Sequence, residues 1–168
     1  MQRISLLTLA LYLGLSSLSA WAENPTSASP ITVEADSLEL NQKSGISTYQ
    51  GHVRLEQQGM QLQADRLELH NDGKQLKQAI ADGKPVHLEQ TDPQTGEKMR
   101  AEALHVEYRF EDGQLELMGE AHLWRSGDQM SGNHLIYDST NRTVRAFGNK
   151  QGNGRVRVIL QPEKESGQ

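Results

Sequence analysis

The sequence predicts an all-β protein built from many short antiparallel strands. From residue 31 onward apolar and polar residues alternate, which is typical of strands with one buried and one solvated face. Short turn sequences rich in Gly, Asp, Asn and Pro separate these runs at 71–73, 92–93, 111–113, 126–128 and 152–154. A similar segment also recurs four times. Together these features indicate stacked hairpins of similar shape, and no segment of the mature chain has a convincing helical period.

The alternation slips by one residue within MQLQADRLELH at 60–70. Met60, Leu62 and Ala64 have one parity, whereas Leu67 and Leu69 have the other. Side chains on a strand change face at every residue, so a flat strand with this sequence would turn its second half to the wrong side. We therefore expect a bulge or bend just after Ala64.

The same slip occurs in all four repeats. These are TVEADSLEL (32–40), QLQADRLEL (61–69), KMRAEALHV (98–106) and QMSGNHLIY (129–137). Each contains a small residue followed by an acid or amide, and the four pairs are Ala35-Asp36, Ala64-Asp65, Ala101-Glu102 and Gly132-Asn133. Because an amide cannot replace a general acid, we interpret these polar residues as structural, bonding their own backbone at a kink.

Strands are expected over sixteen segments, and two architectures fit them. The segments are 31–35, 37–41, 45–50, 52–57, 61–64, 66–71, 75–82, 86–90, 98–101, 103–110, 114–118, 121–125, 129–131, 134–138, 143–148 and 155–160. They fit either a solenoid or a two-sheet sandwich of jelly-roll type. The bend within each repeat favours strands that fold over into a second sheet, giving a V-shaped or incompletely closed roll with an apolar interior.

The N-terminus reads as a secretory signal peptide. Residues 1–22 have one charge, at Arg3, then an apolar run too short to span a membrane, and the cleavage motif Ala20-Trp21-Ala22. With cleavage after Ala22, we expect a flexible leader at 23–30, a single domain at 31–160 and a polar tail at 161–168. The mature chain has no other run of membrane length, so a location beyond the inner membrane, in the periplasm, is expected.

Composition excludes several classes of function. The chain has no cysteine, which removes disulfides, thiol catalysis and thiolate metal sites. Its formal net charge of −5 at neutral pH lacks the basic surface that nucleic acids require.

Four segments resemble the OstA-like domain family of lipopolysaccharide transport. They are ITVEADSLELNQKSGISTYQGHV (31–53), GKPVHLEQ (83–90), AEALHVEY (101–108) and LMGEAHLW (117–124). The resemblance covers almost all of the mature chain. It implies a twisted, partly open β-jelly-roll whose apolar interior groove carries the acyl chains of lipopolysaccharide. It also implies head-to-tail self-association and joining to inner-membrane LptC-like and outer-membrane LptD-like jelly-roll domains, which would form a bridge across the periplasm.

The residues themselves suit an apolar conduit. Each methylene removed from water contributes roughly 0.8 kcal/mol, so a carrier of acyl chains needs a continuous apolar lining. Aromatic residues are only 5% of the chain, which leaves few large side chains to fill such an interior. The candidate lipid-binding residues are Ile31, Val33, Leu38, Leu40, Val53, Leu55, Met60, Leu62, Leu67, Leu69, Val86, Leu88, Met99, Leu104, Val106, Leu117, Leu123, Met130, Leu135 and Phe147. Any one of them could instead be ordinary core.

The terminal strands are candidates for association with other chains. Neither 31–35 nor 155–160 contains a residue that would block a further strand, and RVRVIL (155–160) begins by alternating arginine with valine. An added strand could continue the ladder by β-augmentation, unless the chain's own tails cover both edges.

No catalytic residue or metal site emerges, and no cofactor is expected. Five histidines, His52, His70, His87, His105 and His122, have the parity of the solvent face, and His134 is ambiguous. None forms a metal-binding spacing such as HxH or HExxH. Four arginines, Arg54, Arg66, Arg100 and Arg125, could meet lipid phosphates near a groove mouth or simply lie scattered on the surface.

Three other functions remain open from the sequence. The protein could be a lipid shuttle that does not oligomerise, a repeat protein with a filled interior, or an envelope glycan hydrolase. The last requires a focused pair of acids, which the sequence does not show.

Overall fold

The computed structural model describes residues 29–149 and 154–162, and these form strands and turns without helices. The expected all-β class is therefore confirmed. The predicted signal peptide lies outside the described residues, as does most of the predicted leader and tail. In the part that is described, no helix is long and apolar enough to cross a membrane.

Ten strands make up the described chain. They are β1 (Thr32–Glu34), β2 (Ser37–Asn41), β3 (Ile46–Gln57), β4 (Met60–Asp72), β5 (Gln75–Thr91), β6 (Lys98–Arg109), β7 (Gln114–Arg125), β8 (Asp128–Asp138), β9 (Thr143–Phe147) and β10 (Arg157–Ile159). Pairs of strands predicted as separate are single long strands in β3 to β8. The sequence shows each bend as a break in parity, but hydrogen bonding continues on both sides of it.

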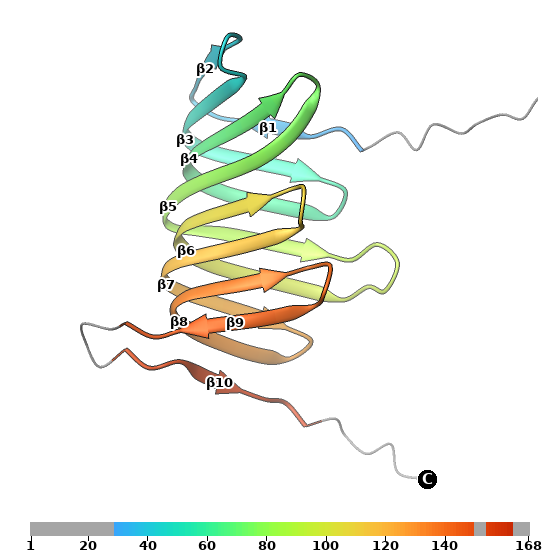
Figure 1. Cartoon of the computed structure of the whole chain (residues 1–168), viewed down its shortest axis with the longest axis vertical. Coiled ribbons are helices and arrows are strands. Elements are labelled where there is room, and N and C mark those ends of the chain that lie inside the picture. Colours follow the sequence, from blue (N-terminus) through green and yellow to red (C-terminus); the bar gives the residue numbers. More distant parts are fainter. Residues whose placement is uncertain (1–28, 150–153, 163–168) are drawn as a thin grey trace, which may run out of the picture.

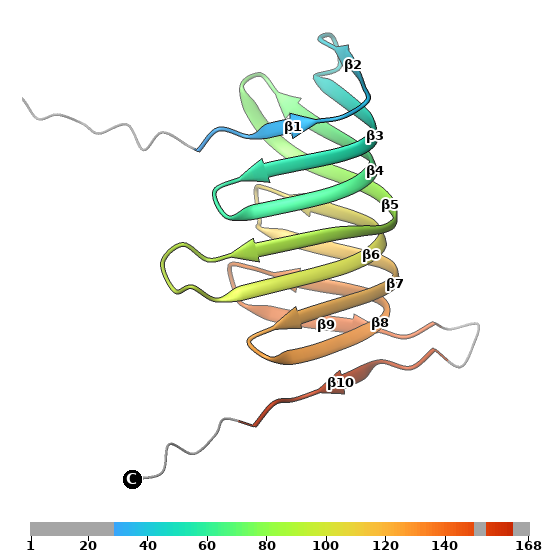
Figure 2. The ribbon, with the colours of Figure 1, turned by 180° about the vertical axis from the view of Figure 1, so that it is seen from behind.

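All ten strands belong to one antiparallel sheet that folds over into two layers and does not close (Figure 1). Strands β3 to β8 follow one another and each crosses from one layer to the other. In layer 1 the ends of the sheet are β1, paired with β3, and β10, paired with β8. In layer 2 the ends are β2, paired with β3, and β9, paired with β8. Figure 2 shows the same two layers from behind.

The line along which the strands bend, called the crease below, is where the register shifts. Shifts occur between Gln63 and Arg66 on β4 and at the matching points of β3, β5, β6 and β7. On β3 the bend is made by Gly51, whose φ is 80° and whose absent Cβ would lie 2.2 Å from Asp36 Oδ2. The extra residues at each bend restore the parity, so both halves of every long strand turn apolar side chains inward. This is the predicted consequence of the slip.

Small residues line the inner side of the crease. Ala64, Ala103, Ala121 and Gly132 lie on neighbouring strands, and the three alanines are buried. Two of them pair with buried valines, Ala64 with Val53 and Ala103 with Val86, so small and medium side chains fill the space where the two layers converge. This explains the small residue of the second and fourth repeats, Ala64 and Gly132.

The third repeat was assigned two residues out of register. The pairing places Ala103 and Leu104, rather than Ala101 and Glu102, opposite the bends of the neighbouring strands. Ala101 instead lies in the straight part of layer 1, paired with Leu88 and Leu123.

Two of the acids predicted to bond their own backbone, Asp36 and Glu102, contact other side chains instead. The Asp36 carboxylate accepts a hydrogen bond from His52 Nδ1 at 2.8 Å, and Glu102 contacts His87 at 3.1 Å and also Arg100. They thus bind side chains of the outer surface, rather than their own backbone.

The histidines lie on the outer surface, as predicted for five of them. His134 lies there too, with Nε2 3.1 Å from Glu116. His105 contacts Asp82 at 2.6 Å and Glu107 at 3.1 Å. Partial burial lowers the pKa of His105, but the hydrogen bonds and charges of Asp82 and Glu107 outweigh it, so its pKa is raised.

We predict that Ala121→Leu destabilises the fold by about 1–3 kcal/mol, because it overpacks the crease where the layers meet. Chemical denaturation measures the change. Gln61→Leu, on the exposed outer face of β4, is the control and should have little effect. Equal stability of the two variants would contradict the tight crease.

We also predict a pH-dependent contribution from His105. Because its pKa is raised in the folded state, its stabilisation is fully present below about pH 6.5 and is lost as pH rises through the folded-state value. His105→Asn should therefore flatten the fall in unfolding free energy between about pH 6 and 8. An unchanged slope would show that the contacts with Asp82 and Glu107 do not act in solution.

Candidate functional site

The inner faces of the two layers form an apolar trough that runs the length of the sheet. In layer 1 one row of paired inward residues comprises Val33, Leu55, Leu62, Leu88, Ala101, Leu123, Met130 and Val158. A facing row in layer 2 comprises Leu38, Tyr49, Leu67, Ala81, Val106, Leu117, Leu135 and Ala146. The crease closes one side of the trough. The opposite side, called the mouth, lies between the turns of layer 1 and those of layer 2.

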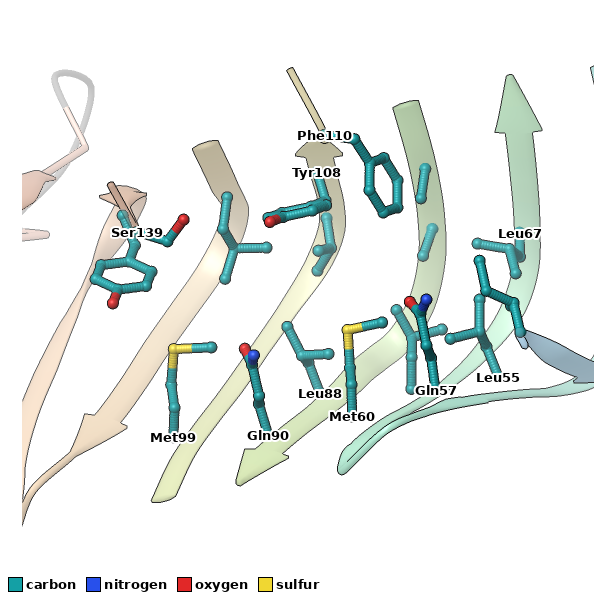
Figure 3. A pocket seen from close by; sticks show the side chains of 17 residues that line it. Leu55, Gln57, Met60, Leu67, Leu88, Gln90, Met99, Tyr108, Phe110 and Ser139 are labelled. Atoms are coloured by element: carbon teal, nitrogen blue, oxygen red, sulfur yellow. The ribbon is translucent and has the colours of Figure 1, made fainter. Parts of the chain in front are cut away.

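A cavity of about 130 Å³ lies within this trough, lined from strands β3 to β8. Figure 3 shows Met60 and Met99 on one side of the cavity and Tyr108 and Phe110 on the other, with Gln90 between the two methionines and Gln57 beside Met60. The lining is mainly aliphatic and includes two flexible methionines, which adapt to irregular apolar ligands. The cavity is smaller than the ~300–1,000 Å³ of typical ligand pockets. The two layers must therefore separate before several long chains can occupy the trough.

Most of the predicted lipid-binding residues lie where they were expected. Eleven are buried in the interior cluster: Val53, Leu55, Leu62, Leu67, Leu69, Val86, Leu88, Val106, Leu117, Leu123 and Leu135. Five are partly buried against it: Ile31, Val33, Met60, Met99 and Met130. The structure brings these sixteen together, and their role in lipid binding stays a prediction.

Two residues predicted to face inward lie on the outer surface. Leu104 is 42% exposed and packs over Gly119. It was predicted to face inward because the third repeat was placed two residues out of register. Phe147 pairs with His134, and their rings lie 5.6 Å apart on the outer face. The inward residues of β9 are instead Val144 and Ala146, because its parity follows that of β8.

Leu38 and Leu40 lie on the inward face but remain uncovered. Both are 57% exposed, since β2 is the last strand of layer 2. At the other end of the sheet Val158 and Leu160 are also exposed. Apolar surface of the trough thus continues to both ends of the sheet.

Several inward residues were missed by the sequence analysis. Leu115 continues the alternation of Leu117, and Tyr108 continues that of Val106, so extending each alternation by one position would have found them. Tyr137 pairs with Leu115 and faces the same way.

The mouth is polar and carries an ion pair between the layers. Glu97, in the turn between β5 and β6, accepts hydrogen bonds from Arg125 Nε at 2.7 Å and Ser126 Oγ at 2.6 Å. Its other oxygen lies 2.8 Å from Nη2 of Arg142, in the turn between β8 and β9 of layer 2. Hydrogen bonds from Arg125 and Ser126 lower the pKa of Glu97, so its carboxylate stays charged.

Of the four arginines considered from the sequence, Arg125 lies at the mouth. It occupies an inward position beside Met99, and its guanidinium carbon lies 5.2 Å from the Tyr137 ring centroid. Arg54, Arg66 and Arg100 lie on outward positions.

Within the described ranges, Asp36 and Glu102 do not form a catalytic pair. Asp36, between β1 and β2, and Glu102, on β6, lie on the outer surface, where they contact His52 and His87 respectively. Among the described residues, no three His, Asp or Glu side chains are placed to hold a metal ion.

Comparison with known proteins identifies the family. The family model described as "LptA/(LptD N-terminal domain) LPS transport protein" matches residues 32–143. The chain belongs to this family. It is a family of transport proteins, so the expectation that the chain is not an enzyme agrees with it.

Curated relatives support the assignment. The lipopolysaccharide export system protein LptH of Pseudomonas aeruginosa is 28% identical over 143 residues, which is 82% of each chain. The lipopolysaccharide export system protein LptA of Escherichia coli K12 is 25% identical over 160 residues, covering 94% of this chain and 85% of that protein.

A solved structure shares the fold. The crystal structure of LptH, described as the LptA-homologous periplasmic component of the lipopolysaccharide transport device of Pseudomonas aeruginosa, superposes with a TM-score of 0.71 at 27% identity. The match covers 80% of this chain and 96% of that one. The expected jelly-roll fold of this family is thereby confirmed.

Proposed function

We propose that the protein binds lipopolysaccharide by its acyl chains in the trough and passes it between the inner and outer membranes. The observation that carries this proposal is the apolar inward face, which continues over every strand and reaches both ends of the sheet uncovered. The membership of a lipopolysaccharide transport family supports it. The periplasmic location described for the LptH relative and the sequence of residues 1–22 support the same location for this protein, after cleavage of a signal peptide.

The energetics favour acyl chains over other ligands. Each buried methylene contributes roughly 0.8 kcal/mol, so a dozen methylenes approach ~10 kcal/mol as an upper limit. The trough provides aliphatic side chains for this burial and few polar groups, since Gln57 and Gln90 lie toward the mouth. The headgroup would then stay at the polar mouth or in solvent.

The protein also has the surfaces needed for head-to-tail association. In layer 1, β1 and β10 have a partner strand on one side only, and so do β2 and β9 in layer 2. Exposed apolar residues accompany these edges at both ends, with Leu38 and Leu40 on β2 and Val158 on β10. Joining β10 of one copy to β1 of the next would be a heterologous contact that continues the sheet and the trough. The same edges could take jelly-roll domains of the LptC and LptD type.

Photo-cross-linking tests lipid binding. Benzoylphenylalanine at Leu62 or Val106, both buried in the trough, should label purified lipopolysaccharide, whereas the same group at Leu104 should not. Leu104 is a matched control because it is also apolar but lies on the outer face. Equal labelling at all three positions would contradict the trough assignment, and no labelling would favour an interior filled by its own side chains.

Truncation tests association. Removing residues 155–168 deletes β10 and should abolish concentration-dependent self-association in sedimentation velocity, while labelling at Leu62 persists. Removing 163–168 alone is the control and should leave association unchanged. A full-length protein that stays monomeric at all concentrations, with lipid exchange intact, would instead show a free shuttle.

A further inference from the structure

The contact between Glu97 and Arg142 joins the two sides of the mouth. Glu97 belongs to the turn at 92–97 in layer 1, and Arg142 is the last residue of the turn before β9 in layer 2. In the described part of the chain, no second ion pair connects a turn of one layer to a turn of the other. The remaining pairs lie within one layer or on the outer side of the crease. This contact therefore spans the mouth at one place, across the half of the trough formed by β6 to β9.

The two partners are held very differently. Glu97 is 22% exposed and is fixed on layer 1 by Arg125 and Ser126. Arg142 is 62% exposed, and its guanidinium forms an ion pair with Glu97. Ion pairs with such an exposed partner are weak and are screened by salt. One side is thus a rigid anchor and the other can release.

A second contact beneath the ion pair brings the same layers together. The Arg125 guanidinium lies over the Tyr137 ring, which projects inward from layer 2. A hollow of about 290 Å³ surrounds these groups, and it shares Gln90, Met99, Tyr137 and Ser139 with the apolar cavity. The ion pair therefore lies directly over the apolar interior.

At the other half of the mouth, the described residues form no ion pair between the layers. Between Ile31 and the turn that holds Lys74 lies a hollow of about 610 Å³, which shares Ile31, Gln57 and Phe110 with the cavity. The trough is therefore accessible from the side near β1 and β4 and bridged near β7 and β9.

We propose that Glu97 and Arg142 form a latch across the mouth, and that its opening gives long alkyl chains access to the half of the trough formed by β6 to β9. While the latch is closed, chains reach the half near β3 and β4. Arg125 and Ser126 are positioning residues, because they hold the Glu97 carboxylate toward Arg142. This inference rests on the proposed function, since it names the residues that control lipid access to the trough.

Spin labels test the latch without any lipid. The chain has no native cysteine, so cysteines at Gln94 and Thr143 can be labelled selectively on the two sides of the mouth. Arg142→Glu places two carboxylates together and should lengthen and broaden the distance distribution measured by double electron–electron resonance. Arg142→Lys should keep the distribution of the parent protein, and Arg145→Glu on the outer face of β9 controls for the change in charge. High salt should act like Arg142→Glu.

Cross-linking tests the consequence for lipid. Benzoylphenylalanine at Leu62 reports the half near β4, and the same group at Leu123 reports the half near β7. Arg142→Glu should increase lipopolysaccharide labelling at Leu123 relative to Leu62. Joining cysteines at positions 97 and 142 with a cleavable thiol cross-linker should abolish labelling at Leu123 and retain it at Leu62. Joining Asp112 and Thr140, whose turns both belong to layer 2, is the control.

The outcomes separate this inference from the proposed function. An unchanged spin-label distance in Arg142→Glu overturns the latch, whatever the lipid result. Wider separation with an unchanged ratio of labelling at Leu123 and Leu62 shows a structural contact only, and also overturns it. Absence of labelling at both positions in the parent protein contradicts lipid binding itself, and the spin-label result then reports on the mouth alone.

Discussion

The fold depends on the tight contact of the two layers along the crease. Each long strand must bend where the layers converge, and it must add residues there so that its second half also faces inward. Ala64, Ala103 and Ala121 allow the close approach, while large residues such as Leu67 and Leu117 fill the space farther out. Without these small residues the halves of each strand would separate, and neither apolar face would be covered. A single bent sheet thus acts as its own second layer.

The same constraint keeps the trough open on the side opposite the crease. Layers that touch along one line diverge away from it, so the inward side chains near the mouth, such as Met60, Met99 and Tyr137, are only partly buried. A closed sandwich would need a second line of contact at the mouth. This protein has polar and flexible side chains there instead, together with one exposed ion pair. The interior is therefore compact at the crease and adaptable at the mouth.

The sequence predicted the inward face well wherever alternation was unbroken, and failed where the bends had to be located. Parity placed Leu55, Leu62 and Leu88 correctly, because one residue of error would have put polar neighbours inside. In the third repeat, however, two alanines, Ala101 and Ala103, are both small enough for the crease, and only strand pairing distinguishes them. Because of that ambiguity, Leu104 was predicted to face inward although it lies on the outer surface. The contact of Glu97 with Arg142 could not be predicted at all, since it joins turns 45 residues apart that become neighbours only when the sheet folds over.

The strength of the latch relative to lipid burial decides what it can do. An exposed ion pair contributes about 0–1 kcal/mol, whereas burying even a few methylenes contributes roughly 0.8 kcal/mol each. A latch of this strength can shift the share of acyl chains in the half of the trough beneath it by a few-fold, but it cannot exclude them completely at equilibrium. It can bias the empty protein toward a narrow mouth, which limits exposure of the apolar interior to water and to other hydrophobic surfaces. A carrier that receives lipid from one neighbour and gives it to the next requires such a weak closure. A strong closure would either prevent lipid from entering the trough or prevent bound lipid from leaving it.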